Sequence, residues 1–133
     1  MRKNVEEIKE QLIPVFEKYR DRIVFAYLFG STARSDLYPS GDVDIAVSVQ
    51  GADANESFDL KLSLHADFCR ALKRRNVDVV ILNRTKNIML LDQIVREGIV
   101  LFDTDEDARQ DFEVDVLHRA MDFKEHRLSV MGM

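Results

Sequence analysis

Three aspartates interrupt segments of this sequence that are otherwise apolar, and they are the first residues to consider for chemistry. Asp42 and Asp44 enter an apolar segment that continues as Ile45–Val47, and Asp78 lies between two valines further along the chain. Residues two apart on a β-strand share one face, about 6.6–6.8 Å apart along the strand. Like charges placed so close together call for a positive partner.

A divalent cation would allow all three aspartates to stay ionised at once. Oxygen ligands with no histidine or cysteine nearby in the sequence favour hard metals such as Mg²⁺ or Mn²⁺ over zinc. Mg²⁺ commonly binds one or two carboxylates together with several waters and substrate phosphates. The sequence therefore predicts a catalytic metal site of Asp42, Asp44 and Asp78, with a nucleoside triphosphate as its companion. A solvent-facing pair and a solvated Asp78 are the simpler alternatives.

Gly30 and Ser31 offer a place for the phosphates of that nucleotide. They follow the apolar run 23–29, where a buried strand is expected to give way to a short helix over residues 31–36. Free backbone N–H groups and the positive end of the helix dipole favour phosphate at such a point, and Arg34 lies one turn further on. Gly30, Ser31 and Arg34 are thus expected to bind nucleotide, although a helix cap is the simpler role for Ser31 and a surface charge for Arg34.

The spacing of apolar residues predicts an α/β domain with a small sheet to position these side chains. One domain is expected over residues 1–133, because this length is close to the commonest domain size. Polar residues 50–56 are expected to form a loop. Strands are expected over residues 23–29, 43–49, 77–82 and 99–102, and helices over 4–19, about 58–75, 86–97 and about 105–127.

Composition excludes several classes of protein. The chain is 46% hydrophobic and 32% charged, as is usual for a soluble domain, and its net charge of −5 argues against direct nucleic-acid binding and against an anionic membrane surface. No apolar run approaches the ~20 residues of a membrane span, and the first eleven residues turn acidic where a signal peptide would be apolar. With one cysteine there is no disulfide framework, so a cytoplasmic protein is expected.

The order of these motifs resembles the GS-x10-DxD signature of the DNA polymerase beta-type nucleotidyltransferase superfamily, and the chain is similar to its minimal nucleotidyltransferase (MNT) domains. Gly30-Ser31 stands ten residues before Asp42-Val43-Asp44, and Val77-Asp78-Val79 follows as a hydrophobic-Asp-hydrophobic strand. The chain departs from the family pattern at two positions. Gly41 replaces the usual serine before the first aspartate, and Ser35 replaces a common glycine after the arginine. The resemblance implies a nucleotidyltransferase fold with a mixed sheet of about four strands flanked by helices.

The resemblance also implies Mg²⁺-dependent transfer of a nucleotide, with ATP as the expected substrate. Asp42 and Asp44 would bind the metals, and Asp78 would complete the site beside the incoming hydroxyl and help it to lose its proton. Gly30 and Ser31 would hold the outer phosphates. The resemblance covers roughly residues 23–102, and the C-terminal helix less specifically.

Standalone MNT proteins are commonly antitoxins paired with HEPN-domain toxins, and some transfer AMP to a tyrosine of the toxin and so silence its RNase activity. The resemblance therefore implies a HEPN-domain partner in a hetero-oligomer. In the last helix, Leu117, Met121 and Leu128 widen an apolar stripe that the core is expected to absorb; they indicate either deep packing or a docking edge. The stripe itself consists of Phe112, Val116, Ala120 and Phe123.

Other functions stay open at this point. A small-molecule nucleotidyltransferase, such as an aminoglycoside-modifying enzyme, would normally carry an extra helical domain, for which a chain of this length is expected to have no room. An antitoxin could also act by binding alone, with an intact site. The choice of ATP over other triphosphates, the acceptor residue and the oligomeric state do not follow from the sequence.

Overall fold

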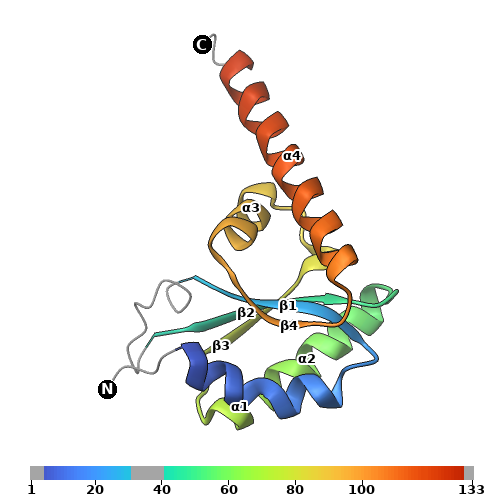
Figure 1. The fold of residues 1–133 in the computed structure, drawn as a ribbon, viewed down its shortest axis with the longest axis vertical. Coiled ribbons are helices and arrows are strands. Elements are labelled where there is room, and N and C mark those ends of the chain that lie inside the picture. The colour runs from blue at the N-terminus through green and yellow to red at the C-terminus, as the bar shows by residue number, and fades with distance from the viewer. Residues whose placement is uncertain (1–4, 31–40, 131–133) are drawn as a thin grey trace.

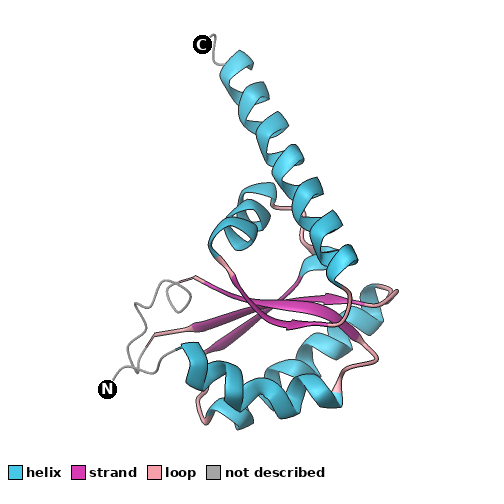
Figure 2. Ribbon diagram, viewed as in Figure 1, coloured by secondary structure: helices cyan, strands magenta, loops and turns pink. Residues whose placement is uncertain are grey.

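Two layers of helices enclose a four-stranded sheet in the computed structural model, which describes residues 5–30 and 41–130 (Figure 1, Figure 2). The short helix expected over residues 31–36 lies outside the described residues. Along the described chain the elements are α1 (Val5–Lys18), β1 (Ile23–Phe29), β2 (Val43–Val49), α2 (Ala54–Leu72), β3 (Val77–Ile81), the 3-10 turn η1 (Leu82–Arg84), α3 (Ile88–Glu97), β4 (Ile99–Asp103) and α4 (Glu106–Val130).

The sheet is mixed, as expected. Its strand order is β3-β2-β1-β4, with β1 antiparallel to both β2 and β4, and β2 parallel to β3. The α/β fold class is therefore confirmed. β1 and β2 are the two central strands, and the near-continuous apolar run of residues 23–29 predicted the burial of β1.

Each face of the sheet is covered by a pair of helices. α1 and α2 pack on one face, and α3 with the first half of α4 packs on the other (Figure 1). The core under α1 and α2 includes the large fully buried side chains Ile8, Leu12, Phe16, Leu64 and Phe68. The smaller core on the other face includes Phe25, Tyr27, Leu91, Ile94 and Val116.

The start of α2 differs from the expected elements. The loop expected over residues 50–56 ends at Asp53, and the helix begins at Ala54. The Asp53 side chain accepts a hydrogen bond of 2.8 Å from the backbone N–H of Glu56. This bond satisfies one of the donors left free at a helix N-terminus, so the polar stretch starts the helix instead of extending the loop.

α4 is anchored to the sheet through its first half. The hydroxyl of Tyr27 in β1 donates to Glu113 at 2.7 Å, and Arg109 binds Asp103 at 2.6 Å and Glu113 at 3.2 Å. The second half of the helix extends away from the sheet (Figure 1). Lys124 still reaches Asp92 of α3 at 3.6 Å. Phe123, however, is 39% exposed, and its expected place in the core is wrong.

The rest of the apolar stripe in α4 behaves in part as expected. Within the stripe, Val116 and Ala120 are fully buried and Phe112 is half-buried. Met121, one of the residues that widen the stripe, is 54% exposed. The side chain of Leu128 lies outside the described residues. No helix in the part of the chain that the structure describes is long and apolar enough to cross a bilayer.

Candidate functional site

Asp44 lies at the centre of the candidate site, where the end of β1 meets the start of β2. It is paired with Phe29 of β1 on one side and with Asp78 of the parallel strand β3 on the other. Neighbouring strands are about 4.8 Å apart, so residues in register on adjacent strands place their side chains side by side. Two of the three aspartates predicted to converge are thus direct neighbours across the sheet.

Gly30 comes directly after β1 and lies against the Asp44 carboxylate. Its backbone has a positive φ of 76°, a conformation that residues with a side chain rarely adopt. A Cβ at this position would also collide with the Asp44 Oδ2 atom. Glycine therefore avoids two separate costs here, a strained backbone and displacement of the Asp44 carboxylate.

The electrostatic surroundings of Asp44 disfavour its charged form. Burial raises the pKa of the half-buried Asp44 above the ordinary value of 3.8, and the nearby charges of Asp78 and then Asp42 raise the pKa further. Both of those neighbours are exposed to solvent. A full negative charge on Asp44 is thus disfavoured in the protein alone, and a cation bound among the three groups would reverse that effect.

The donor set fits a hard divalent cation only when further ligands complete it. Among residues 5–30 and 41–130, no group of three or more histidine, cysteine, aspartate or glutamate side chains is arranged to hold a metal ion. The aspartates are near neighbours without forming a closed cage. Mg²⁺ often takes one or two carboxylates and completes its shell with waters and substrate phosphates, so the paired strand carboxylates fit such a site.

Arg74 and Asn76 fix the backbone immediately before Asp42. Both side chains donate hydrogen bonds to the carbonyl oxygen of Gly41, and Arg74 Nε also donates to Asn76 Oδ1 at 2.8 Å. The backbone N–H of Val43 donates to the Asn76 carbonyl at 2.9 Å. A basic run at a helix C-terminus, such as residues 73–75, is typical of a solvated helix end, so the sequence alone does not predict this role of Arg74.

Replacing Arg74 by alanine is expected to loosen the segment that carries Asp42. Loss of its charged hydrogen bond to Gly41 should destabilise the fold by about 1–3 kcal/mol. Nucleotide transfer should fall more than that loss of folded protein explains. Melting temperature and transfer rate should be measured beside the exposed neighbour Arg75→Ala, and equal effects of the two substitutions would show that Arg74 has no positioning role.

The remaining residues singled out from the sequence fall into two groups. Ser31 and Arg34 lie outside the described residues, so their nucleotide-binding roles stay predictions. His65 has the helical spacing of the apolar residues of α2, which predicts a place at the core or its boundary. In the structure it is exposed, and its ring contacts the half-buried Cys69 thiol at 3.7 Å.

The mixed sheet with an acidic cluster at the end of β1 is that of an α/β nucleotidyltransferase fold. The family described as "Polymerase beta, Nucleotidyltransferase" matches residues 10–107, most of the chain. The chain belongs to this family. Comparison with curated protein sequences gives no match.

Several solved structures share the fold over nearly the whole chain. A toxin–antitoxin complex with AMP-PNP gives a TM-score of 0.74 at 23% identity, over 93% of this chain and 95% of that chain. The tri-AMPylated Shewanella oneidensis HEPN toxin in complex with its MNT antitoxin gives 0.69 at 23% identity, over 96% and 95%. The toxin–antitoxin MntA-HepT gives 0.69 at 22% identity, over 96% of both. At these identities the likeness shows a common fold.

Proposed function

We propose that this chain is a Mg²⁺-dependent protein adenylyltransferase that moves AMP from ATP to a tyrosine of a HEPN-family toxin and thereby neutralises it. The observation that carries the proposal is the pairing of Asp44 with Asp78 across β2 and β3, beside a glycine whose missing side chain makes room for the Asp44 carboxylate. Membership of the nucleotidyltransferase family supports the same reaction.

In the proposed reaction the tyrosine oxygen forms a bond to the α-phosphorus of ATP. The bond from that phosphorus to the oxygen bridging to the β-phosphate breaks, and pyrophosphate leaves. Asp78 is exposed at the start of β3, where it can accept the proton of the incoming hydroxyl.

Asp42 and Asp44, with Asp78, would hold the metal. When bound, Mg²⁺ would neutralise charge on the attacking and leaving oxygens. The raised pKa of Asp44 supports this assignment, because a carboxylate that is destabilised in its charged form gains most from a cation. The positive φ of Gly30 turns the chain sharply after β1, and we assign to Gly30, Ser31 and Arg34 the binding of the triphosphate.

The proposed partner rests on the fold neighbours and on α4. The neighbours include a HEPN toxin bound to an MNT antitoxin and carrying AMP, and a toxin–antitoxin complex with an ATP analogue. In this chain the half of α4 that extends from the core exposes Met121 and Phe123, by 54% and 39%. Exposed apolar side chains on a projecting helix suit a protein partner, in a hetero-oligomer with the toxin.

The test is to mix the purified chain with the HEPN-family toxin encoded beside its gene, in the presence of ATP and MgCl₂. Intact-mass spectrometry should show the toxin gaining the mass of AMP, and peptide mapping should place it on tyrosine. EDTA should prevent the gain, and the RNase activity of the modified toxin should be lost. A toxin that is silenced without any gain of mass would instead show an antitoxin that works by binding alone.

A further inference from the structure

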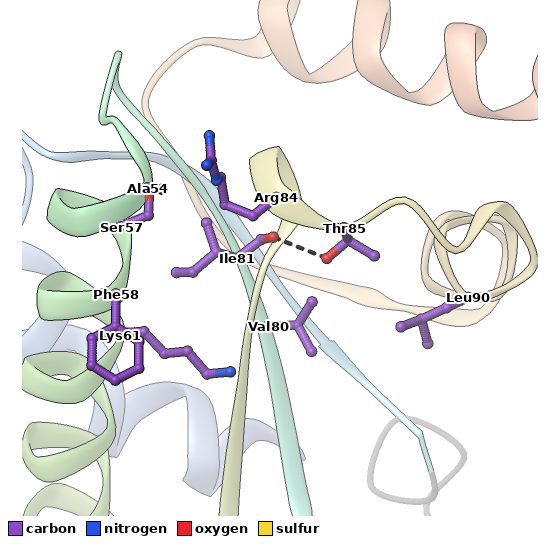
Figure 3. Close-up of a pocket in the computed structure, with 9 residues that line it drawn as sticks. All are labelled: Ala54, Ser57, Phe58, Lys61, Val80, Ile81, Arg84, Thr85 and Leu90. Carbon is purple, nitrogen blue, oxygen red and sulfur yellow. Dashed lines mark hydrogen bonds between the residues drawn. The ribbon is translucent and has the colours of Figure 1, made fainter.

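A cavity of about 380 Å³ opens at the outer edge of β3, on the side of the sheet away from β1. Side chains of α2 form one wall, while η1 and α3 form the other (Figure 3). Val80 and Ile81 face opposite sides of the sheet and both line the cavity, which therefore wraps around the strand edge. The other lining residues are Ala54, Ser57, Phe58, Lys61, Arg84, Thr85 and Leu90.

Ser57 provides a buried polar group in this cavity that lacks a partner. It is only 2% exposed, and its Oγ atom makes no hydrogen bond within the described structure. A buried hydroxyl without a partner is unusual in native proteins and costs stability. The lining position of Ser57 means that a bound molecule could satisfy its hydroxyl group.

The rim of the cavity combines positive charge with exposed apolar surface. Lys61 extends from α2 toward β3, and Arg84 extends from η1 (Figure 3). Within residues 5–30 and 41–130, Lys61 forms no salt bridge, whereas a backbone hydrogen bond and, to a lesser extent, the charge of Arg84 lower the pKa of the nearby Asp53. Phe58 is 61% exposed and Leu62, one helical turn further on, is 54% exposed. Charge complementarity therefore favours an occupant with acidic groups around an apolar anchor.

β3 also presents an unpaired strand edge to this cavity. In the described sheet it pairs with β2 alone and lies at the end of the strand order. The free edge of a β-sheet can bind an extended peptide through backbone hydrogen bonds, and neighbouring pockets select the side chains of that peptide. Val80 and Asp78 are two residues apart and share a face of β3, so the cavity lies about 6.6–6.8 Å along the strand from the proposed catalytic carboxylate.

We propose that the cavity and the edge of β3 form an acceptor groove, which binds an extended acidic segment of the protein substrate and leads its hydroxyl to Asp78. The inference rests on the proposed function, because it requires a protein acceptor. An apolar side chain of the segment packs against Phe58, its acidic groups meet Lys61 and Arg84, and Ser57 hydrogen bonds to its polar atoms. This arrangement supplies the positioning that a transfer between two bound substrates needs.

Charge reversal at the rim tests the groove. The double variant Lys61→Glu/Arg84→Glu should raise the KM for the HEPN-family toxin by at least about tenfold, because like charges would then repel the acidic segment. The kcat at saturating toxin and the affinity for ATP with MgCl₂, measured by calorimetry, should stay at the wild-type level. Phe58→Asp should act in the same direction through loss of the apolar anchor.

Matched variants on α1 serve as controls. Lys9→Glu changes a charge and Ile13→Asp changes an apolar residue that is 51% exposed, both on a different helix. These should leave the KM for the toxin unchanged. An unchanged KM in the rim variants would overturn the groove. A loss of ATP affinity in the rim variants would also overturn it, because the cavity would then belong to the nucleotide.

Photo-crosslinking tests the groove even if the toxin is not modified, which separates its failure from that of the proposed function. p-Benzoylphenylalanine at position 58, compared with position 13, should crosslink to the toxin in the assembled pair. Mass spectrometry should map the crosslink to an acidic segment of the toxin. Crosslinks to a second copy of this chain, crosslinks to a helix of the toxin, or equal labelling from position 13 would each contradict the proposal.

Discussion

Replacing Asp44 by asparagine is expected to lower AMP transfer by at least about a hundredfold while the protein stays folded. Asp44 is the aspartate with a strand neighbour on each side, Phe29 and Asp78, so it sets the centre of the proposed metal and phosphate site. Asparagine keeps the size of the side chain and removes its charge. Asp42→Asn should act in the same direction, and the exposed Asp21→Asn should have no effect on transfer.

In the metal-free protein, Asp44→Asn should raise stability although it lowers transfer. Because the pKa of Asp44 is raised in the folded state, its contribution to stability is fully present below its unfolded value of 3.8 and is lost as the pH rises through the raised value. In EDTA, Asp44→Asn should therefore gain in melting temperature relative to wild type between pH 4 and pH 7. A lower melting temperature across that range would assign Asp44 a structural role.

With added Mg²⁺ and ATP at neutral pH, wild type should have a higher melting temperature than Asp44→Asn. A ligand that binds only the folded state stabilises it by an amount that grows with concentration over Kd. Wild type should gain melting temperature with both ligands together, and Asp44→Asn should gain less. An equal gain in the two proteins would place nucleotide binding away from Asp44.

The sequence predicted best those features that depend on local pattern. The bounds of β1 and β2 agree with the expected strands because both are apolar runs ended by glycine or polar residues. The early start of α2 could have been predicted, since Asp53 with Glu56 three residues later is a capping-box pattern. The polar composition of residues 50–56 favours a loop, and the capping hydrogen bond outweighs it from Asp53 onward.

The features that were missed depend on contacts between distant parts of the chain. Arg74 reaches Gly41 across 33 positions, and nothing in the basic run 73–75 distinguishes it from its neighbours. Phe123 has the helical spacing of a core residue, but whether α4 still touches the core at that point depends on where the helix crosses α3. The pairing of Asp44 with Asp78 likewise required the strand register, although their convergence was expected.

Replacing Gly30 by alanine is the second substitution for which a large effect is expected. The new methyl group would meet the Asp44 Oδ2 atom, so either the carboxylate or the end of β1 must move. Displacement of a positioned group by about 1 Å can cost about a hundredfold in rate, and transfer should fall by that order. The positive φ of 76° adds a backbone cost of about 1–2 kcal/mol in stability.

Gly51→Ala provides the matched control, because it separates backbone strain from collision with the carboxylate. Gly51 also has a positive φ, of 40°, but a Cβ there would meet nothing within 4 Å. Both variants should lose stability through backbone strain in urea unfolding, and Gly30→Ala should lose more because of the collision. Only Gly30→Ala should also lose transfer and weaken ATP binding, and a Gly30→Ala protein with the activity of Gly51→Ala would show that the space beside Asp44 has no part in catalysis.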